Sequence, residues 1–206
     1  MSSPGAITHA PEGMVDREMS NATSGKVGMW IYLITDAMTF GGLLIGYAYL
    51  RAQAMGTWPD PAEHLGIGLS SIATFILICS SVSMVLAIRG SSMANRQQLI
   101  GWLAVTIAGG AVFLGIQVYE YKHLLHEGIG FASFGHGTAL FASTFYAITG
   151  FHGAHVLTGV IYLIVILFKS LNGRYDGDPS HVEIAGLFWH FVDLIWILVF
   201  TFIYLL

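Results

Sequence analysis

The sequence predicts an all-α integral membrane protein, a bundle of five transmembrane helices with the N-terminus in the cytoplasm. Hydrophobic residues make up 55% of the 206 residues and charged residues only 10%, whereas a soluble domain usually has about a quarter charged residues. Five apolar segments are each long enough to cross a hydrocarbon core about 30 Å thick, which takes roughly 20 helical residues. This composition excludes an ordinary globular enzyme and a disordered protein. The net charge of -4 excludes a nucleic-acid partner, which needs a basic surface.

The five segments are expected at residues 27–50, 66–88, 99–119, 139–168 and 182–206. They are predicted to be helices because lipid contains no water to satisfy a free backbone N–H or C=O group. Residues 1–26 contain Ser, Thr, Pro and Gly and no apolar stretch, so they are predicted to form a flexible cytoplasmic tail. The chain therefore divides into this tail and a membrane domain over residues 27–206.

The basic residues beside the segments predict the orientation, because Lys and Arg are concentrated on the cytoplasmic side of membrane proteins. More of them lie on the side of the N-terminus, which places that terminus in the cytoplasm or in a mitochondrial matrix. That side has Arg17, Lys26, Arg89, Arg96, Lys169 and Arg174, and the other side has only Arg51 and Lys122.

The ionisable residues inside the segments are the candidate functional residues. A charge at the centre of a bilayer costs between about 3 and more than 10 kcal/mol, so such residues face protein, pair with one another or stay neutral. Asp36 has no charged neighbour three or four positions away, so its partner must be another helix, water or a neutralising proton. The set comprises Asp36, His152, His155, His190 and Asp193 near mid-depth, and Glu120 and Glu183 nearer the helix ends.

His190 and Asp193 are three residues apart, and so are His152 and His155. This spacing lets the two side chains of each pair meet on one face of a helix. Both a structural contact that fixes helix packing and a proton-relay or ligand-contact role fit the spacing.

Two alternatives involve cofactors or metals. Haem ligation by His155 and His190 is considered because the two residues lie at compatible depths in neighbouring segments. His123 and His126, with Glu127, have side chains that bind divalent ions, but a solvated loop is the favoured explanation of the three residues. The single cysteine, Cys79, provides neither a disulfide framework nor a thiolate cluster.

Small and hydroxyl-bearing residues predict how the helices pack. Gly42 and Gly46 in the first segment, and Gly150, Ala154 and Thr158 in the fourth, are each four residues apart, and Gly153 and Gly159 lie beside the second set. Such spacing lets helix backbones approach closely in lipid. Serine hydroxyls in the second segment can bond to other helices or to their own carbonyl groups. These serines are Ser70, Ser71, Ser80, Ser81 and Ser83.

Four stretches of the sequence form recognisable motifs. They are Ile-Thr-Asp at 34–36 with Phe40, Gln-Val-Tyr-Glu-Tyr at 117–121, Thr-Gly-Phe-His-Gly-Ala-His-Val at 149–156 with Gly159, and Phe-Trp-His-Phe-Val-Asp at 188–193 with Trp196. In sequence and in order along the chain, these motifs resemble the signatures of one family, subunit III of haem–copper terminal oxidases in its five-helix bacterial form.

The resemblance implies a subunit of a complex that reduces oxygen to water and pumps protons. Family members carry no haem, copper or other metal themselves, because these belong to subunits I and II. They pack against subunit I, bind phospholipid between their helices, and support proton uptake and turnover stability. By matching positions, Asp36 would stand for the family's buried, proton-linked carboxylate. The accompanying polar network would comprise Glu120, His152, His155, Glu183, His190 and Asp193.

Two departures from the family pattern qualify this resemblance. The mitochondrial form has seven helices, whereas this chain has five apolar segments, as bacterial forms do, so a bacterial inner membrane is expected. The buried carboxylate is Asp36 rather than the more usual glutamate.

The electron donor, cytochrome c or a quinol, is left open, because donor sites lie in other subunits. The competing interpretations are an accessory protein of nitric oxide reductase, a stand-alone transporter and a haem-bearing electron-transfer subunit.

Overall fold

The computed structural model describes residues 12–54, 58–60, 65–131, 139–173 and 179–206, with side chains described from Ser24 onward. Five long helices make up almost all of this part of the chain. They are α1 (Glu12–Gln53), α3 (Ile67–Ser92), α4 (Arg96–His126), α5 (Ala139–Leu171) and α6 (Ser180–Phe200), and α6 continues into a π-helical segment, η1 (Thr201–Leu205). All five are long and apolar enough to span a membrane, and the described residues form no strand. The predicted fold class is therefore confirmed.

The helices are longer than the predicted segments. α1 begins at Glu12, so residues 12–26, which were expected to form a flexible tail, continue the first helix instead. α4 likewise runs on to His126. A helix that already exists extends without a new nucleation cost, and helix-favouring residues such as Glu, Met, Arg and Lys then prolong it into the polar region. Residues 1–11 of the predicted tail, and Arg174 of the predicted charge pattern, lie outside the described residues.

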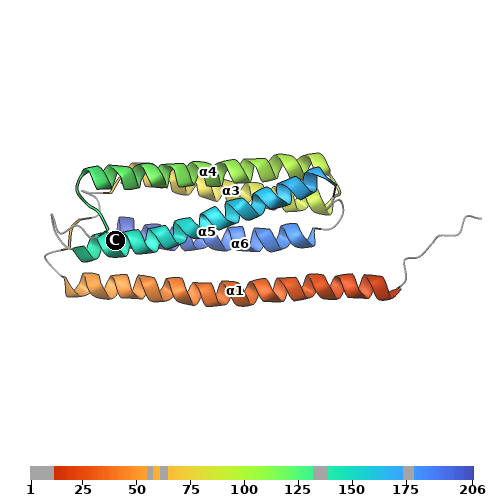
Figure 1. Ribbon diagram of the computed structural model, residues 1–206, viewed down its shortest axis with the longest axis horizontal. Coiled ribbons are helices and arrows are strands. Elements are labelled where there is room, and N and C mark those ends of the chain that lie inside the picture. Colours follow the sequence, from red (N-terminus) through yellow and green to blue (C-terminus); the bar gives the residue numbers. More distant parts are fainter. Residues whose placement is uncertain (1–11, 55–57, 61–64, 132–138, 174–178) are drawn as a thin grey trace, which may run out of the picture.

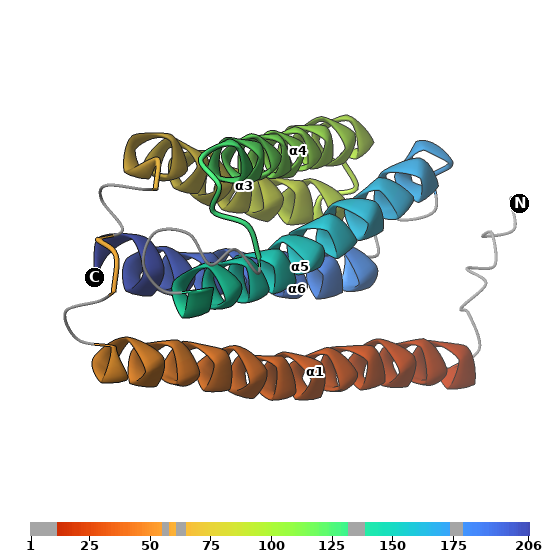
Figure 2. The ribbon, with the colours of Figure 1, turned by 60° about the vertical axis from the view of Figure 1, so that its left-hand side comes forward.

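α6 lies at the centre of the bundle. It contacts α1, α3 and α5, and it is the most buried of the five helices. Figures 1 and 2 show α1 along one side of the molecule, α5 and α6 in the middle, and α3 and α4 together on the far side. Two interhelical faces of α6 are therefore available for polar contacts, one toward α1 and α5 and the other toward α3.

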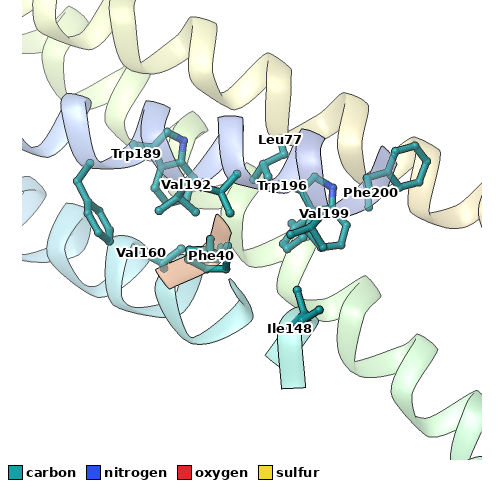
Figure 3. Packing of buried hydrophobic residues seen from close by; sticks show 14 of the residues in the cluster. Phe40, Leu77, Ile148, Val160, Trp189, Val192, Trp196, Val199 and Phe200 are labelled. Atoms are coloured by element: carbon teal, nitrogen blue, oxygen red, sulfur yellow. The ribbon is translucent and has the colours of Figure 1, made fainter. Parts of the chain in front are cut away.

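Large side chains of α6 form the middle of the core. Figure 3 shows Trp189, Val192 and Trp196 along α6, with Leu77 of α3 on one side and Phe40 of α1 on the other. All five are buried. Because lipid is as apolar as these side chains, close packing and interhelical hydrogen bonds, rather than the hydrophobic effect, hold such helices together.

Hydroxyl groups of α3 provide several of these hydrogen bonds. The indole Nε1 of Trp189 donates to Oγ of Ser80 over 3.1 Å, and Nε1 of Trp196 donates to Oγ1 of Thr74 over 2.9 Å. Ser80 also bonds back to the carbonyl oxygen of Leu77. Both expected kinds of serine bond are therefore confirmed, and the two tryptophan bonds fix α3 and α6 in an antiparallel register.

Only some of the predicted small residues pack against other helices. A Cβ atom added at Gly42 or Gly46 would meet no other part of the described chain within 4 Å. At Gly110 in α4 it would lie 2.5 Å from the ring of Trp189, and at Gly159 in α5 it would lie 3.0 Å from the same ring. These two close approaches are to one bulky side chain of α6, a partner that the spacing of small residues does not reveal.

Candidate functional site: buried polar groups between the helices

Asp36 of α1 pairs with His155 of α5. Oδ1 of Asp36 lies 3.3 Å from Nε2 of His155, and the two side chains are only 9% and 12% exposed. The prediction that Asp36 could take its partner from another helix is confirmed. The pair is a direct polar link between α1 and α5.

The second ring nitrogen of His155 fixes the chemistry of this pair. Nδ1 lies 2.8 Å from the carbonyl oxygen of Phe151, which can only accept, so Nδ1 carries a hydrogen. Nε2 then faces Asp36 either as a second N–H opposite a carboxylate or as a bare nitrogen opposite a carboxylic acid. Both states contain one shared proton and have no net charge, so the pair can hold a proton at depth without burying a net charge.

Two aromatic rings pack against the histidine of this pair. The ring of Phe40 lies 5.4 Å from the His155 ring, and the ring of Phe151 lies 4.6 Å from it, both edge to face. Apolar rings reduce contact with water, and electrostatic interactions strengthen in such a setting.

His152 lies one turn from His155 but does not pair with it. Its ring is fully buried, stacks on Trp196 at 4.9 Å, and meets Phe113 edge to face at 5.9 Å. Neither ring nitrogen has a hydrogen-bond partner among the described residues. His152 therefore packs as an aromatic side chain between α4, α5 and α6, with an unused donor and an unused acceptor.

On α6, the expected pairing of His190 with Asp193 is wrong as a direct hydrogen bond. Nδ1 of His190 bonds to the hydroxyl of Ser81 on α3 instead. Asp193 is buried, and neither carboxylate oxygen has a hydrogen-bond partner in the described part of the chain. The Ser81 hydroxyl lies near Asp193 without making a hydrogen bond to it. A spacing of three residues permits two side chains to meet on one helix. Here the His190 imidazole instead hydrogen-bonds to a hydroxyl on the facing helix.

Glu120 occupies a separate polar cluster. Its two carboxylate oxygens accept hydrogen bonds from the hydroxyls of Ser70 on α3, at 2.9 Å, and Tyr204 on η1, at 2.8 Å. The carboxylate is buried, and it joins α4 to α3 and η1. A cavity of about 250 Å³ beside it is also lined by His123 and Glu127, whose side chains are exposed.

Glu183 is not part of a buried network. It forms an ion pair with Lys26 of α1, and both side chains are about one-third exposed or more. Further along the same two helices, the ring of Tyr32 lies 6.1 Å from that of Phe188. The two contacts run in the same direction along both helices, so α1 and α6 are parallel and in register.

This register places five of the seven predicted residues in one layer across the bundle. Asp36 lies level with Asp193, while His155 joins the layer from α5, and His152 and His190 lie within a turn of it. Glu183 lies toward one end of the bundle and Glu120 toward the other. The predicted set is thus one mid-depth layer with two outlying carboxylates, and only Asp36 and His155 form a direct pair.

Several residues that contact the predicted set, Ser81 and Tyr204 among them, were not singled out as site residues by the sequence. Ser81 was one of five serines with no sign of which helix it would face. Tyr204 lies in an apolar stretch at the end of the chain, and nothing in that stretch indicates a bond to Glu120. Only the packing of α3 and η1 against their neighbours identifies them.

The residues considered for cofactors are directed to different neighbours. His155 faces Asp36, and His190 faces Ser81. His123 and Glu127 lie close together, 3.5 Å apart. Within the described ranges, no three His, Cys, Asp or Glu side chains are grouped in a way that could hold a metal ion.

Taken together, the helices and the polar layer define a five-span integral membrane protein with an interhelical acid–imidazole pair. Comparison with known proteins gives the family. The family model described as cytochrome c oxidase subunit III matches residues 12–206, so the chain belongs to that family. The resemblance of the four motifs is therefore confirmed.

Individual relatives include subunits of two kinds of oxidase. Cytochrome c oxidase subunit 3 of Thermostichus vulcanus is 36% identical over 197 residues, which cover 93% of this chain and 92% of that protein. Cytochrome c oxidase subunit 3 of Synechocystis sp. is 38% identical over 185 residues, which cover 87% and 74%. Cytochrome bo(3) ubiquinol oxidase subunit 3 of Pseudomonas putida is 34% identical over 181 residues, which cover 87% and 84%.

Proposed function

We propose that this chain is the non-catalytic subunit III of a proton-pumping cytochrome c oxidase in an aerobic respiratory chain. The match of the family model over residues 12–206 is the observation that carries the proposal. In this role the chain packs on subunit I, and haem and copper belong to subunits I and II. The chain itself carries no redox centre.

Within the complex, we assign the proton-linked role to Asp36 and its partner His155. A pair that shares one proton at a separation of 3.3 Å is neutral, so it can hold that proton at depth, and releasing it leaves a single buried negative charge. His152, His190 and Asp193 accompany the pair in the same layer. Glu120 and Glu183 hold helices together at the two ends of the bundle through Tyr204 and Lys26.

The proposed setting is the inner membrane of a bacterium, with the N-terminus in the cytoplasm. The excess of basic residues on the N-terminal side supports this orientation. Relatives from Pseudomonas putida and Synechocystis sp. support the bacterial setting. Phospholipids between the helices and around the bundle complete the proposed assembly.

A quinol oxidase is the second candidate complex. The relative from Pseudomonas putida is a subunit of a ubiquinol oxidase, and its 34% identity is close to the 36% of the cytochrome c oxidase subunit from Thermostichus vulcanus. An affinity-tagged chain purified in mild detergent should bring down the haem-bearing subunits. A co-purified copper-binding subunit and oxidation of reduced cytochrome c support the first candidate, whereas oxidation of a quinol alone supports the second.

Asp36→Asn tests the proton-linked role. Asparagine keeps the shape of the side chain but cannot hold a transferable acid proton. We expect the haem content of the complex to stay nearly unchanged while proton-linked turnover, or its durability at high pH, declines. Asp60→Asn in an exposed loop is the control, and it should change neither. Loss of the haem signal together with oxygen reduction would instead identify Asp36 as an assembly element.

A further inference from the structure

Tyr204 of η1 is a buried phenol that donates its hydrogen bond to a carboxylate. The residue is only 1% exposed, and its hydroxyl oxygen lies 2.8 Å from Oε2 of Glu120. The other carboxylate oxygen, Oε1, accepts a hydrogen bond from Ser70 at 2.9 Å. A carboxylate whose two oxygens both accept is in the ionised form, which can take up a proton. The separation from Tyr204 is within the range for direct proton transfer, about 2.6–3.2 Å.

A second tyrosine in the same aromatic cluster has a different partner. The ring of Tyr121 lies 6.2 Å from that of Phe145, and its hydroxyl bonds to the hydroxyl of Thr149 at 2.7 Å. Thr149 itself donates to the carbonyl oxygen of Phe145, so Tyr121 donates to a neutral hydroxyl oxygen, which is a very weak base. Of these two tyrosines, only Tyr204 has a proton acceptor at the end of its hydrogen bond.

Aromatic rings connect Tyr204 to other parts of the bundle. Its ring lies 6.2 Å from that of Trp196, which Figure 3 shows on α6, and 5.7 Å from that of Phe145. From Phe145 the ring contacts continue through Phe141 to Trp58, at 6.1 and 5.6 Å, and Trp58 is partly exposed. Electrons tunnel rapidly between rings this close together, and indole and phenol are among the side chains most easily oxidised by one electron. An oxidising equivalent that reaches either tryptophan therefore has a short path to Tyr204.

The buried position favours loss of an electron together with loss of the phenolic proton. A phenol that has lost an electron is a strong acid, so it gives its proton to a base within hydrogen-bond distance. Before this step the pair carries one negative charge, on Glu120. Afterwards both partners are neutral. Because a buried charge is costly, the combined step removes an unfavourable charge from the interior.

We propose that Tyr204 is a redox-active tyrosine and that Glu120 accepts its proton. A one-electron oxidant of high potential takes one electron from the phenol and is itself reduced by that electron. The O–H bond of Tyr204 breaks, the proton binds to Oε2 of Glu120, and a neutral tyrosyl radical remains. A one-electron reductant reverses the step, and the proton returns to the phenol oxygen.

The inference goes beyond the proposed function, in which haem and copper belong to other subunits. The radical is a transient state of a side chain and forms only when a strong oxidant is present. An oxygen-reducing haem centre in a neighbouring subunit supplies an oxidant of this class. A tyrosine that gives up an electron reversibly then protects other side chains from irreversible oxidation.

The test generates the oxidant with light in the purified full-length chain. The chain in mild detergent is mixed with tris(bipyridine)ruthenium(II) and a sacrificial electron acceptor, and a flash produces the ruthenium(III) oxidant. Electron paramagnetic resonance of rapidly frozen samples then distinguishes a tyrosyl from a tryptophanyl radical. The original chain should give a tyrosyl signal, and ring-deuterated tyrosine should narrow it.

Substitutions identify which tyrosine and which base are involved. Tyr204→Phe should lose the part of the signal that comes from the buried phenol. Glu120→Gln keeps the shape and an acceptor oxygen but offers no carboxylate for the proton, so this part should form about a hundredfold more slowly. Tyr121→Phe is the matched control and should keep the signal. A smaller contribution that remains in all variants comes from the exposed tyrosines Tyr32, Tyr49 and Tyr119.

Solvent isotope exchange provides a measurement that needs no substitution. Formation of the radical in the original chain should be slower in heavy water, because the proton of Tyr204 moves in the same step as the electron. Helical circular dichroism checks that each variant is folded. If Tyr204→Phe does not fold, the isotope effect and Glu120→Gln still decide the question.

Three results would overturn the inference. They are a tyrosyl signal of full size in Tyr204→Phe, a signal that Tyr121→Phe abolishes instead, and formation of the radical in Glu120→Gln at the original rate. A chain that forms the Tyr204 radical but does not co-purify with haem-bearing subunits would support the inference and contradict the proposed function. Failure of one is therefore distinguishable from failure of the other.

Discussion

The pairing of Asp36 with His155 predicts a measurable coupling between the two side chains. In a double-mutant cycle, Asp36→Ala and His155→Ala are combined, and each single change leaves the other polar group unpaired at a buried site. That costs about 1–3 kcal/mol of unfolding free energy. The double variant has no stranded partner, so its destabilisation should be smaller than the sum of the two single values. The difference is the coupling energy.

The structure sets the size of this coupling. Polar pairs between membrane helices contribute about 0.6 kcal/mol on average and up to about 2 kcal/mol. Asp36 and His155 are 3.3 Å apart and little exposed, and the rings of Phe40 and Phe151 pack against His155. We therefore expect about 1–2 kcal/mol. His155→Ala also removes the packing of the imidazole against these rings, but the double variant removes the same packing, so to first order this effect cancels.

The assay is reversible unfolding of the purified chain in mixed micelles by added SDS, followed by helical circular dichroism. His123 and Glu127 provide the control cycle, since their side chains are 59% and 44% exposed and lie 3.5 Å apart. That exposed pair should couple by no more than about 0.5 kcal/mol. Additivity within about 0.5 kcal/mol at Asp36 and His155 would refute the claim that the two side chains depend on each other.

Two further substitutions test the packing of α4 and of η1 in the same unfolding assay. Gly110→Ala would place a Cβ atom 2.5 Å from the Trp189 ring and should destabilise the bundle by about 1–3 kcal/mol. Gly115→Ala on the same helix meets nothing within 4 Å and should be neutral or stabilise by up to about 1 kcal/mol, so equal effects at both sites would contradict the packing. Tyr204→Phe removes a hydrogen bond to Glu120 and should cost about 1–3 kcal/mol. An unchanged unfolding midpoint would show that Glu120 does not depend on that hydroxyl.

Much of the fold follows from hydropathy alone. The segments predicted at 66–88 and 99–119 lie inside α3 (Ile67–Ser92) and α4 (Arg96–His126) to within a residue, because about 20 apolar residues in a row have no stable alternative to a helix in lipid. Helix ends were predicted less well. At α1 the apolar stretch marks the hydrocarbon core, whereas the helix itself begins earlier, at Glu12.

The sequence predicted which residues belong to the candidate site, but it did not predict which residues they contact. Every expected buried ionisable residue lies within a helix, since the cost of a charge in lipid singles such residues out. The link between Asp36 and His155 crosses two helices, and His190 turns to Ser81 rather than to Asp193 three residues away. Spacing within one helix says which side chains share a face, but it contains no information on what the neighbouring helix presents there.

By itself, the sequence determined that the chain is a five-span membrane protein, which residues are costly to bury, and which family it resembles. The tertiary structure decided the partners, namely His155 for Asp36, Tyr204 for Glu120, and the Trp189 ring for Gly110. The physical reason is that lipid and protein core are equally apolar, so an apolar helix shows no hydrophobic stripe that would fix its rotation. Rotation and register come from shape and from a few interhelical hydrogen bonds, and these exist only once the helices are packed.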